Sequence, residues 1–219
     1  MSEHRGIGMT SERTRIRLVK QLKDMGIVNP QVLNSIQTTP RHLFVDEGLA
    51  TRAYENTALP IGHGQTISQP YIVAKMTELL LDGPLGKVLE IGAGCGYQSA
   101  ILSQFADQVY AVERIAPLAI KLRERIQQLR IRNILVKHGD GMQGWEDNGP
   151  YDAILCAAAP AVVPPKLLEQ LKIGGRLVIP VGGEGGHQDL LLITREDEDT
   201  YNEQKLDTVS FVPMRTGVS

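Results

Sequence analysis

The sequence has 219 residues, of which 42% are apolar and 22% are charged. These proportions are typical of a globular protein and exclude disorder for the bulk of the chain. The length suits one α/β domain and is short for two independent cores. The formal net charge of −2 provides no bulk field that would recruit polyanions, so nucleic acid is a poor default partner.

The cysteines and the chain start bear on the cellular location. Cys95 and Cys156 form neither a CxxC pair nor a Cys/His cluster, so the sequence indicates no zinc site and no disulfide framework. No segment has the roughly 18 apolar residues that a membrane helix needs, and the N-terminus lacks the hydrophobic region of a secretory signal. We therefore expect a cytoplasmic protein whose residues 1–9 form a loose tail.

The first part of the chain is expected to be mainly helical. Residues 10 to about 59 show helical periodicity and predict a small helical cover, in which Asn29 and the proline after it mark the start of one helix. Residues 61–70, with the sequence IGHGQTISQP, have no apolar period and predict a structured loop. Pro70 then begins a predicted helix that ends at the Asp-Gly-Pro of residues 82–84.

From residue 86 onward, short apolar runs alternate with helical patterns. This alternation is typical of βαβ units and predicts an α/β fold with a doubly wound, mostly parallel sheet. The last two apolar runs have no helical pattern between them and are expected to form an antiparallel edge of the same sheet. Strands are predicted at residues 87–91, 108–112, 133–137, 151–156, 176–181, 190–194 and 209–212, and helices at residues 97–105, 116–130 and 164–171.

A glycine-rich loop follows the first expected strand of this sheet. Glu90 precedes Gly92, Gly94 and Gly96 in the pattern E-x-G-x-G-x-G. Glycines at alternate positions let the backbone approach a ligand at the carboxyl end of the strand, where doubly wound sheets bind ligands. A dinucleotide fingerprint would need its third glycine at the position that Tyr97 occupies. By itself, the loop is equally compatible with a tight turn.

Two carboxylates are expected at the same edge of the sheet. Glu113 ends the second expected strand, 21 residues after Gly92, where a carboxylate can accept hydrogen bonds from both ribose hydroxyls of a nucleoside. Asp140, followed by Gly141, comes after the third strand and suits either an adenine amino group or a plain turn. The glycine-rich loop and Glu113 together predict one nucleoside pocket.

Through this loop, Glu113 and Asp140, the sequence resembles the class I S-adenosylmethionine-dependent methyltransferases, whose fold is Rossmann-like. More narrowly, it resembles the protein-L-isoaspartate O-methyltransferase family, most specifically through QTISQP at residues 65–70. Some members of that family carry histidine where this chain has Tyr71 and Val73, so proton chemistry assigned to those histidines does not transfer. The narrower resemblance also rests on RHLFV (41–45), YENTALP (54–60), GGRLVIPVG (174–182) and FVPM (211–214).

The resemblance implies transfer of a methyl group from S-adenosylmethionine to the free carboxylate of L-isoaspartyl residues in damaged proteins and peptides, which starts repair through a succinimide. It implies that Ser68 orients the substrate carboxylate, although from the residues alone a helix N-cap is the favoured role of Ser68. Thr66, Ile67 and Val212 are expected to contact the substrate. Donor binding is expected from Glu90, Gly92, Gly94, Gly96, Glu113, Asp140 and Gly141, without a metal.

Other functions remain in competition at this stage. A nucleic-acid methyltransferase is disfavoured because CAAAP stands at residues 156–160, where an amino-directed DNA enzyme has an Asn- or Asp-Pro-Pro-Tyr tetrapeptide. A small-molecule methyltransferase, a nicotinamide-dependent oxidoreductase and a non-catalytic binding module are further alternatives. We expect a monomer with one methyltransferase domain at residues 10–219, comprising a helical cover and substrate loop (10–85) and a cofactor-binding sheet (86–219).

Overall fold

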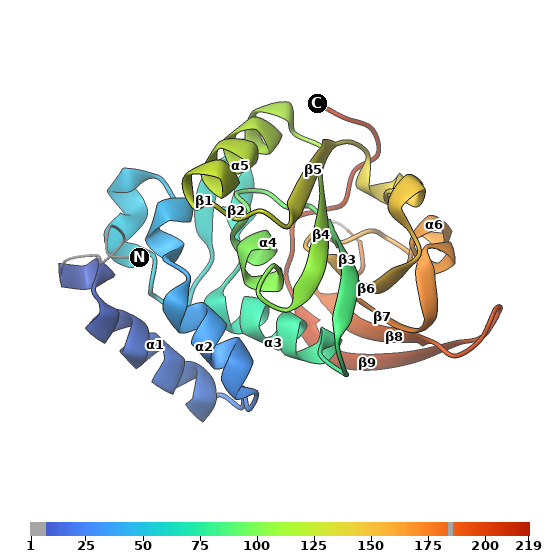
Figure 1. Cartoon of the computed structure of the whole chain (residues 1–219), viewed down its shortest axis with the longest axis horizontal. Coiled ribbons are helices and arrows are strands. Elements are labelled where there is room, and N and C mark those ends of the chain that lie inside the picture. The colour runs from blue at the N-terminus through green and yellow to red at the C-terminus, as the bar shows by residue number, and fades with distance from the viewer. Residues whose placement is uncertain (1–7, 184–185) are drawn as a thin grey trace.

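The computed structural model describes residues 8–183 and 186–219. Residues 1–7, which make up most of the predicted tail, lie outside the described residues, and Gly8–Thr10 form a short 3-10 helix, η1. Helices α1 (Glu12–Asp24) and α2 (Pro30–Thr38) follow and pack against each other. The Asn29 side chain accepts hydrogen bonds from the backbone N–H groups of Gln31 and Val32, which confirms the predicted N-cap. Figure 1 shows both helices to one side of the sheet.

The segment predicted as a loop is a β-hairpin instead. After the 3-10 helices η2 (Arg41–Phe44) and η3 (Glu47–Arg52), strands β1 (Leu59–Gly62) and β2 (Gln65–Ile67) pair antiparallel. Gly62, His63 and Gly64 all have positive φ angles and make the turn. The loop prediction was wrong because the two strands have only four and three residues, so the alternation of buried Leu59 and Ile61 with exposed residues is too short to be recognised. Helix α3 (Pro70–Leu80) then begins at the predicted proline.

Seven strands form one twisted sheet in the order β5-β4-β3-β6-β7-β8-β9. Strands β3 to β7 are parallel to one another, whereas β8 pairs antiparallel with both β7 and β9, which confirms the predicted sheet and its antiparallel edge. The strands are β3 (Leu85–Ile91), β4 (Ala106–Glu113), β5 (Ile134–His138), β6 (Tyr151–Cys156), β7 (Leu171–Val181), β8 (Gln188–Arg195) and β9 (Tyr201–Val209).

Helices cover both faces of this sheet. Buried side chains of α3, α4 and α5 pack on one face, and those of α6 pack on the other, so the central strands β3, β4 and β6 are buried on both sides. This double burial explains why the parallel strands appear in the sequence as continuous apolar runs. The remaining helices are α4 (Tyr97–Leu102), α5 (Ala116–Gln128), α6 (Pro165–Glu169) and the 3-10 helices η4 (Gly141–Gln143) and η5 (Glu146–Asn148).

Two predicted elements near the C-terminus have different bounds in the structure. The helix predicted at residues 164–171 is shorter, because Leu171 already belongs to β7. The strand predicted at residues 209–212 lies instead at residues 201–209, where the mostly exposed edge strand β9 shows no apolar alternation. Residues 211–214 run beside the loop after β6, where Ala159 exchanges backbone hydrogen bonds with Val212 and Met214.

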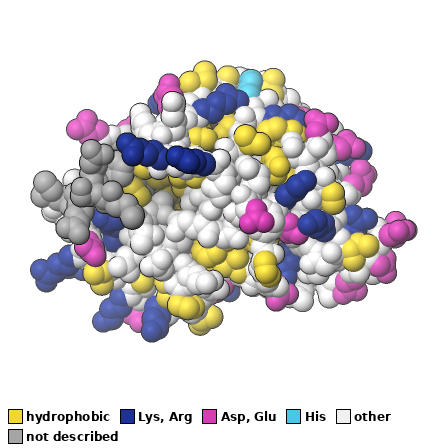
Figure 2. Space-filling view, in the orientation of Figure 1, with side chains coloured by type: hydrophobic (Ala, Val, Ile, Leu, Met, Phe, Trp, Pro, Cys, Tyr) yellow, Lys and Arg dark blue, Asp and Glu magenta, His cyan; other side chains and the backbone are white. Residues whose placement is uncertain are grey.

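The surface carries charges of both signs. On the face that Figure 2 shows, Lys and Arg side chains are spread over several places, with Asp and Glu side chains among them. None of the described helices is both long and apolar enough to cross a membrane.

Candidate active site

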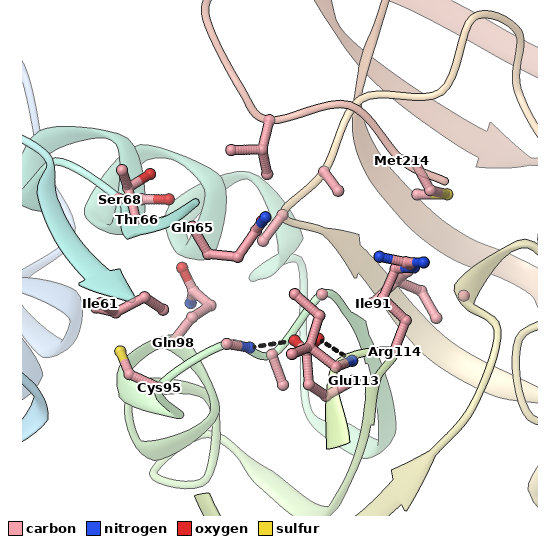
Figure 3. Close-up of a pocket in the computed structure, with 18 of the residues that line it drawn as sticks. Ile61, Gln65, Thr66, Ser68, Ile91, Cys95, Gln98, Glu113, Arg114 and Met214 are labelled. Atoms are coloured by element: carbon pink, nitrogen blue, oxygen red, sulfur yellow. Dashed lines mark hydrogen bonds between the residues drawn. The ribbon is translucent and has the colours of Figure 1, made fainter. Parts of the chain in front are cut away.

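A cavity of about 570 Å³ opens at the carboxyl ends of β3 and β4. It is enclosed by the glycine-rich loop, the β1–β2 hairpin and the segment from Val212 to Arg215 (Figure 3). The fold therefore brings the predicted donor and substrate residues to one place. All of the predicted site residues except Gly96 and Asp140 line the cavity, namely Thr66, Ile67, Ser68, Glu90, Gly92, Gly94, Glu113, Gly141 and Val212.

The glycines of the loop have two different roles. Gly92 and Gly94 have positive φ angles and line the cavity, and a Cβ atom on Gly94 would lie 3.1 Å from Ile61 Cδ1. Gly96 faces away from the cavity, since a Cβ atom there would lie 2.1 Å from Leu122 Cδ1 on α5. Gly92 and Gly94 therefore keep the backbone accessible to a ligand, while Gly96 allows α5 to pack against the loop.

Glu113 ties the end of β4 to the glycine-rich loop. Its Oε2 accepts a hydrogen bond from Gly94 N–H at 2.7 Å, and its Oε1 accepts one from Ile115 N–H at 2.8 Å (Figure 3). The residue is only 4% exposed. Each carboxylate oxygen has a further lone pair, so Glu113 can still accept hydrogen bonds from ligand hydroxyls. Its two backbone contacts hold the carboxylate in a fixed orientation for that purpose.

Glu90 presents a buried carboxyl group to the same cavity. Its Oε2 accepts a hydrogen bond from the Ser99 hydroxyl, whereas its Oε1 has no hydrogen-bond partner among the described residues. Burial raises the pKa of Glu90 to about 8, the Ser99 hydrogen bond opposes this shift, and the charge of Glu113 adds to it. A buried oxygen without a partner is costly, so this wall fits a ligand that brings a hydrogen-bond donor or a positive charge.

Asp140 and Gly141 are adjacent at this edge of the sheet, but only Gly141 lines the cavity. Asp140 Oδ1 accepts a hydrogen bond from Met142 N–H, and its Oδ2 accepts one from Gly217 N–H, both within 2.8 Å. Asp140 therefore caps η4 and holds the C-terminal segment, and its contact with adenine stays a prediction. Gly141 does line the cavity, where a Cβ atom would lie 2.4 Å from Ile91 Cγ2.

Ser68 lies in the short connection between β2 and α3. The N-cap residue of α3 is Gln69 rather than Ser68, and it makes no side-chain capping bond, so the alternative role as a cap is not observed. No hydrogen bond within residues 8–183 and 186–219 uses the Ser68 hydroxyl. Figure 3 shows Ser68 and Thr66 on one side of the cavity and Glu113 on the other. The hydroxyl is thus available to a ligand in the cavity wall.

Sequence reasoning missed several lining residues. Gln65, Cys95, Tyr97 and Gln98 all border the cavity. Burial raises the pKa of the Cys95 thiol, which keeps it neutral, and Gln98 Nε2 donates a hydrogen bond to Thr77 Oγ1 at 2.9 Å. Cys95, Tyr97 and Gln98 could have been found from their position in or directly after the glycine-rich loop. In doubly wound folds the loop after the strand and the first turn of the following helix border the ligand.

The arrangement fits a nucleoside-containing cationic donor. Within the described ranges, no group of three or more His, Cys, Asp or Glu side chains is placed to hold a metal ion. The cavity instead combines accessible loop backbone, the fixed carboxylate of Glu113 and the unpartnered oxygen of Glu90. Together with the mostly parallel sheet and its antiparallel edge, these features define a class I S-adenosylmethionine-dependent methyltransferase.

Comparisons with known proteins identify the family within this class. The profile of the protein-L-isoaspartate(D-aspartate) O-methyltransferase (PCMT) family matches residues 13–219. The chain is 59% identical over 218 residues to a protein-L-isoaspartate O-methyltransferase of Cellvibrio japonicus, covering 98% of this chain and 96% of the relative. It is 55% identical over 214 residues to one of Alcanivorax borkumensis, covering 97% and 96%. The chain therefore belongs to the protein-L-isoaspartate(D-aspartate) O-methyltransferase family, as the sequence resemblance predicts.

Solved structures agree with this assignment. A protein-L-isoaspartate O-methyltransferase superposes with a TM-score of 0.85 at 26% identity, covering 93% of this chain and 67% of that one. A second structure, from Plasmodium falciparum in complex with S-adenosyl-L-homocysteine, has a TM-score of 0.76 at 26% identity and covers 91% and 97%. The family assignment decides against the alternative of a nicotinamide-dependent oxidoreductase.

Proposed function

We propose that this protein transfers the methyl group of S-adenosylmethionine to the free carboxylate of L-isoaspartyl residues in damaged proteins and peptides. The observation that carries the proposal is the family match over residues 13–219. This range includes the QTISQP segment, which borders the same cavity as the glycine-rich loop. The methyl ester then closes to a succinimide, whose hydrolysis returns some normal aspartate.

The donor is held by the carboxyl ends of β3 and β4. Glu113 accepts hydrogen bonds from the ribose hydroxyls, and the backbone of Gly92 and Gly94 approaches the donor closely. Glu90, with one oxygen that has no partner among the described residues, would form a hydrogen bond with a polar group of the donor. When bound, S-adenosylmethionine supplies an electrophilic methyl group on a sulfonium. Glu90, Glu113 and the loop therefore determine where that methyl group points.

The substrate side supplies orientation rather than a base. A carboxylate is already ionised at neutral pH, so no general base is needed to generate the nucleophile. Ser68 donates a hydrogen bond that aims one carboxylate oxygen at the methyl group, while Thr66, Ile67 and Val212 contact the peptide. Such in-line positioning can account for about 7–11 kcal/mol of the barrier.

We further infer that two parts of the chain have different roles. Residues 10–85 provide the cover and the substrate loop, and residues 86–219 provide the donor-binding sheet. The partners are proteins and peptides with isoaspartyl residues, and the protein acts as a monomer in the cytoplasm. The net charge of −2 supports a protein substrate over nucleic acid.

A pair of matched peptides tests the proposed function. One synthetic peptide contains L-isoaspartate, and the other has normal L-aspartate at the same position. With radiolabelled S-adenosylmethionine, we expect methylation of the first peptide and background labelling of the second. Equal labelling of both peptides would contradict the substrate assignment, and labelling of neither would contradict the activity.

A further inference from the structure

The substrate cover contains a fully buried arginine. Arg41, the first residue of η2, is 0% exposed, and its guanidinium contacts three backbone carbonyls. Nε donates to Ala53 O at 2.9 Å, and Nη2 donates to Ser68 O at 2.8 Å and, more weakly, to Thr57 O at 3.5 Å. One guanidinium therefore joins the end of η3 to the residue whose hydroxyl stands in the cavity wall.

Among residues 8–183 and 186–219, no carboxylate forms an ion pair with this arginine. Its Nη1 also has no hydrogen-bond partner among these residues. The groups that act electrostatically on it are Tyr97, Cys95 and Tyr54, and burial lowers the pKa of Arg41 below its usual value. Burying an unpaired cation is destabilising, so packing alone does not explain an arginine at this position.

The same guanidinium also touches the donor side. Its central carbon lies 4.8 Å from the centre of the Tyr97 ring, in cation–π geometry. Tyr97 is the first residue of α4, directly after the glycine-rich loop, and it lines the cavity. Its ring is held from another side by Phe44, 5.4 Å away between ring centres. Arg41 is therefore in contact with residues of both the substrate wall and the donor wall.

We propose that Arg41 is a positioning residue for methyl transfer, which fixes Ser68 relative to the donor loop by binding the Ser68 carbonyl while stacking on Tyr97. This inference rests on the proposed function. Arg41 does not line the cavity, so we expect it to act on the substrate through Ser68. If the Ser68 backbone moves, its hydroxyl no longer aims the carboxylate at the methyl group.

The chemistry of arginine suits this task better than that of lysine. A planar guanidinium can donate in its plane to two carbonyls while its face stacks on an aromatic ring. A lysine ammonium is a point charge that cannot hold the Ala53 and Ser68 carbonyls and cover Tyr97 at once. Arg41→Lys therefore keeps the buried positive charge but loses the simultaneous contacts with the two carbonyls and the Tyr97 ring. This makes it the informative substitution.

Steady-state kinetics on an isoaspartyl peptide test the proposal. We expect Arg41→Lys to lower kcat about 10- to 100-fold, since small misplacements of reacting groups have effects of that size. The Kd for S-adenosylhomocysteine, measured by calorimetry, should change less than about threefold, because the contacts of Glu113 and Gly94 remain. Arg15→Lys is the matched control, because Arg15 is also buried but contacts Gln37 O instead. It should keep wild-type kcat.

A double-mutant cycle separates positioning from general destabilisation. If Arg41 acts through Ser68, Arg41→Lys should cause less than about a twofold further loss of kcat in a Ser68→Ala background. A full multiplicative loss in that background, wild-type kcat in Arg41→Lys alone, or a parallel loss of donor affinity would each overturn the proposal. A wild-type enzyme without isoaspartyl activity would instead contradict the proposed function, so the two failures are distinguishable.

A measurement on the wild-type protein covers the case in which Arg41→Lys fails to fold. In a protein with ¹⁵N-labelled arginine, we expect the Nε resonance of Arg41 to shift when isoaspartyl peptide binds in the presence of S-adenosylhomocysteine. The Arg15 resonance should stay in place. An unmoved Arg41 resonance under saturating peptide would show that substrate binding is not coupled to Arg41 and would overturn the proposal.

Discussion

The donor wall and the substrate wall of the cavity are built in different ways. Glu90 and Ile91 stand at the end of β3, where each pairs in register with a residue of β4 and a residue of β6. Ser68 instead follows a short two-stranded hairpin, and its carbonyl is held by a side chain 27 residues earlier in the chain. The residues proposed to bind the methyl donor are therefore positioned by many backbone hydrogen bonds of the sheet. Ser68, proposed to bind the substrate, is positioned by only a few side-chain contacts. Substitutions on the two sides should therefore have different effects.

The largest expected effect tests the substrate wall. Ser68→Ala should lower kcat about 100-fold on an isoaspartyl peptide, because the hydroxyl that orients the carboxylate is removed. The affinity for S-adenosylhomocysteine should stay close to that of the wild type. Ser103→Ala, which removes a hydroxyl bonded to Ala100 O outside the cavity, is the control and should keep full turnover. Near-wild-type turnover of Ser68→Ala would show that the orienting role is wrong.

The next expected effect concerns the packing beneath the donor wall. Gly96→Ala places a Cβ atom 2.1 Å from Leu122 Cδ1 at a φ angle of +87° and should lower the free energy of unfolding by about 2–4 kcal/mol. Gly26→Ala is the matched control, since Gly26 has a φ angle of +100° but no atom within 4 Å of its added Cβ. It should cost only the backbone strain of about 1–2 kcal/mol.

Urea denaturation measures both variants. If the loss of stability is the same for Gly96→Ala and Gly26→Ala, contact with α5 does not constrain the glycine-rich loop. The difference between the two walls would then lie in backbone conformation rather than in packing.

The smallest expected effect concerns the pH dependence of stability. In the unfolded chain the pKa of Glu90 is about 4.5, and burial raises it to about 8 in the folded protein. Between these values the unfolded state has released a proton that the folded state retains, so the Glu90 contribution to stability falls as pH rises. Glu90→Gln has no such proton, so between the two pKa values its stability should fall by about 1.4 kcal/mol less per pH unit than that of the wild type.

Unfolding curves measured between pH 5 and pH 8 give this difference. Glu47→Gln removes an exposed carboxylate on η3 and should keep the wild-type slope. Parallel slopes for Glu90→Gln and the wild type would contradict the assignment of a protonated, buried carboxyl to the donor wall.

Most of the donor wall was predictable from the sequence, since its signals are local. The apolar runs of β3 and β4, the glycine-rich loop between β3 and α4, and Glu113 occur in a fixed order along the chain. Parallel strands buried on both faces must be apolar throughout, so the apolar runs by themselves predict the sheet. Predictions failed where local signals are weak. The strands of the β1–β2 hairpin have only four and three residues, too few to show a period, and β9 is a mostly exposed edge strand.

The sequence by itself determined the class of fold, the donor loop and the strand-end carboxylate, because burial and glycine spacing leave periodic traces in the order of residues. Only the tertiary structure decided that Asp140 holds Gly217, that Gly96 packs on Leu122, and that Arg41 lies under Ser68 and against Tyr97. Each of these contacts joins residues at least 26 positions apart, which local patterns do not encode. Such contacts depend on how the cover and the sheet meet in space, so the three-dimensional fold alone fixes them.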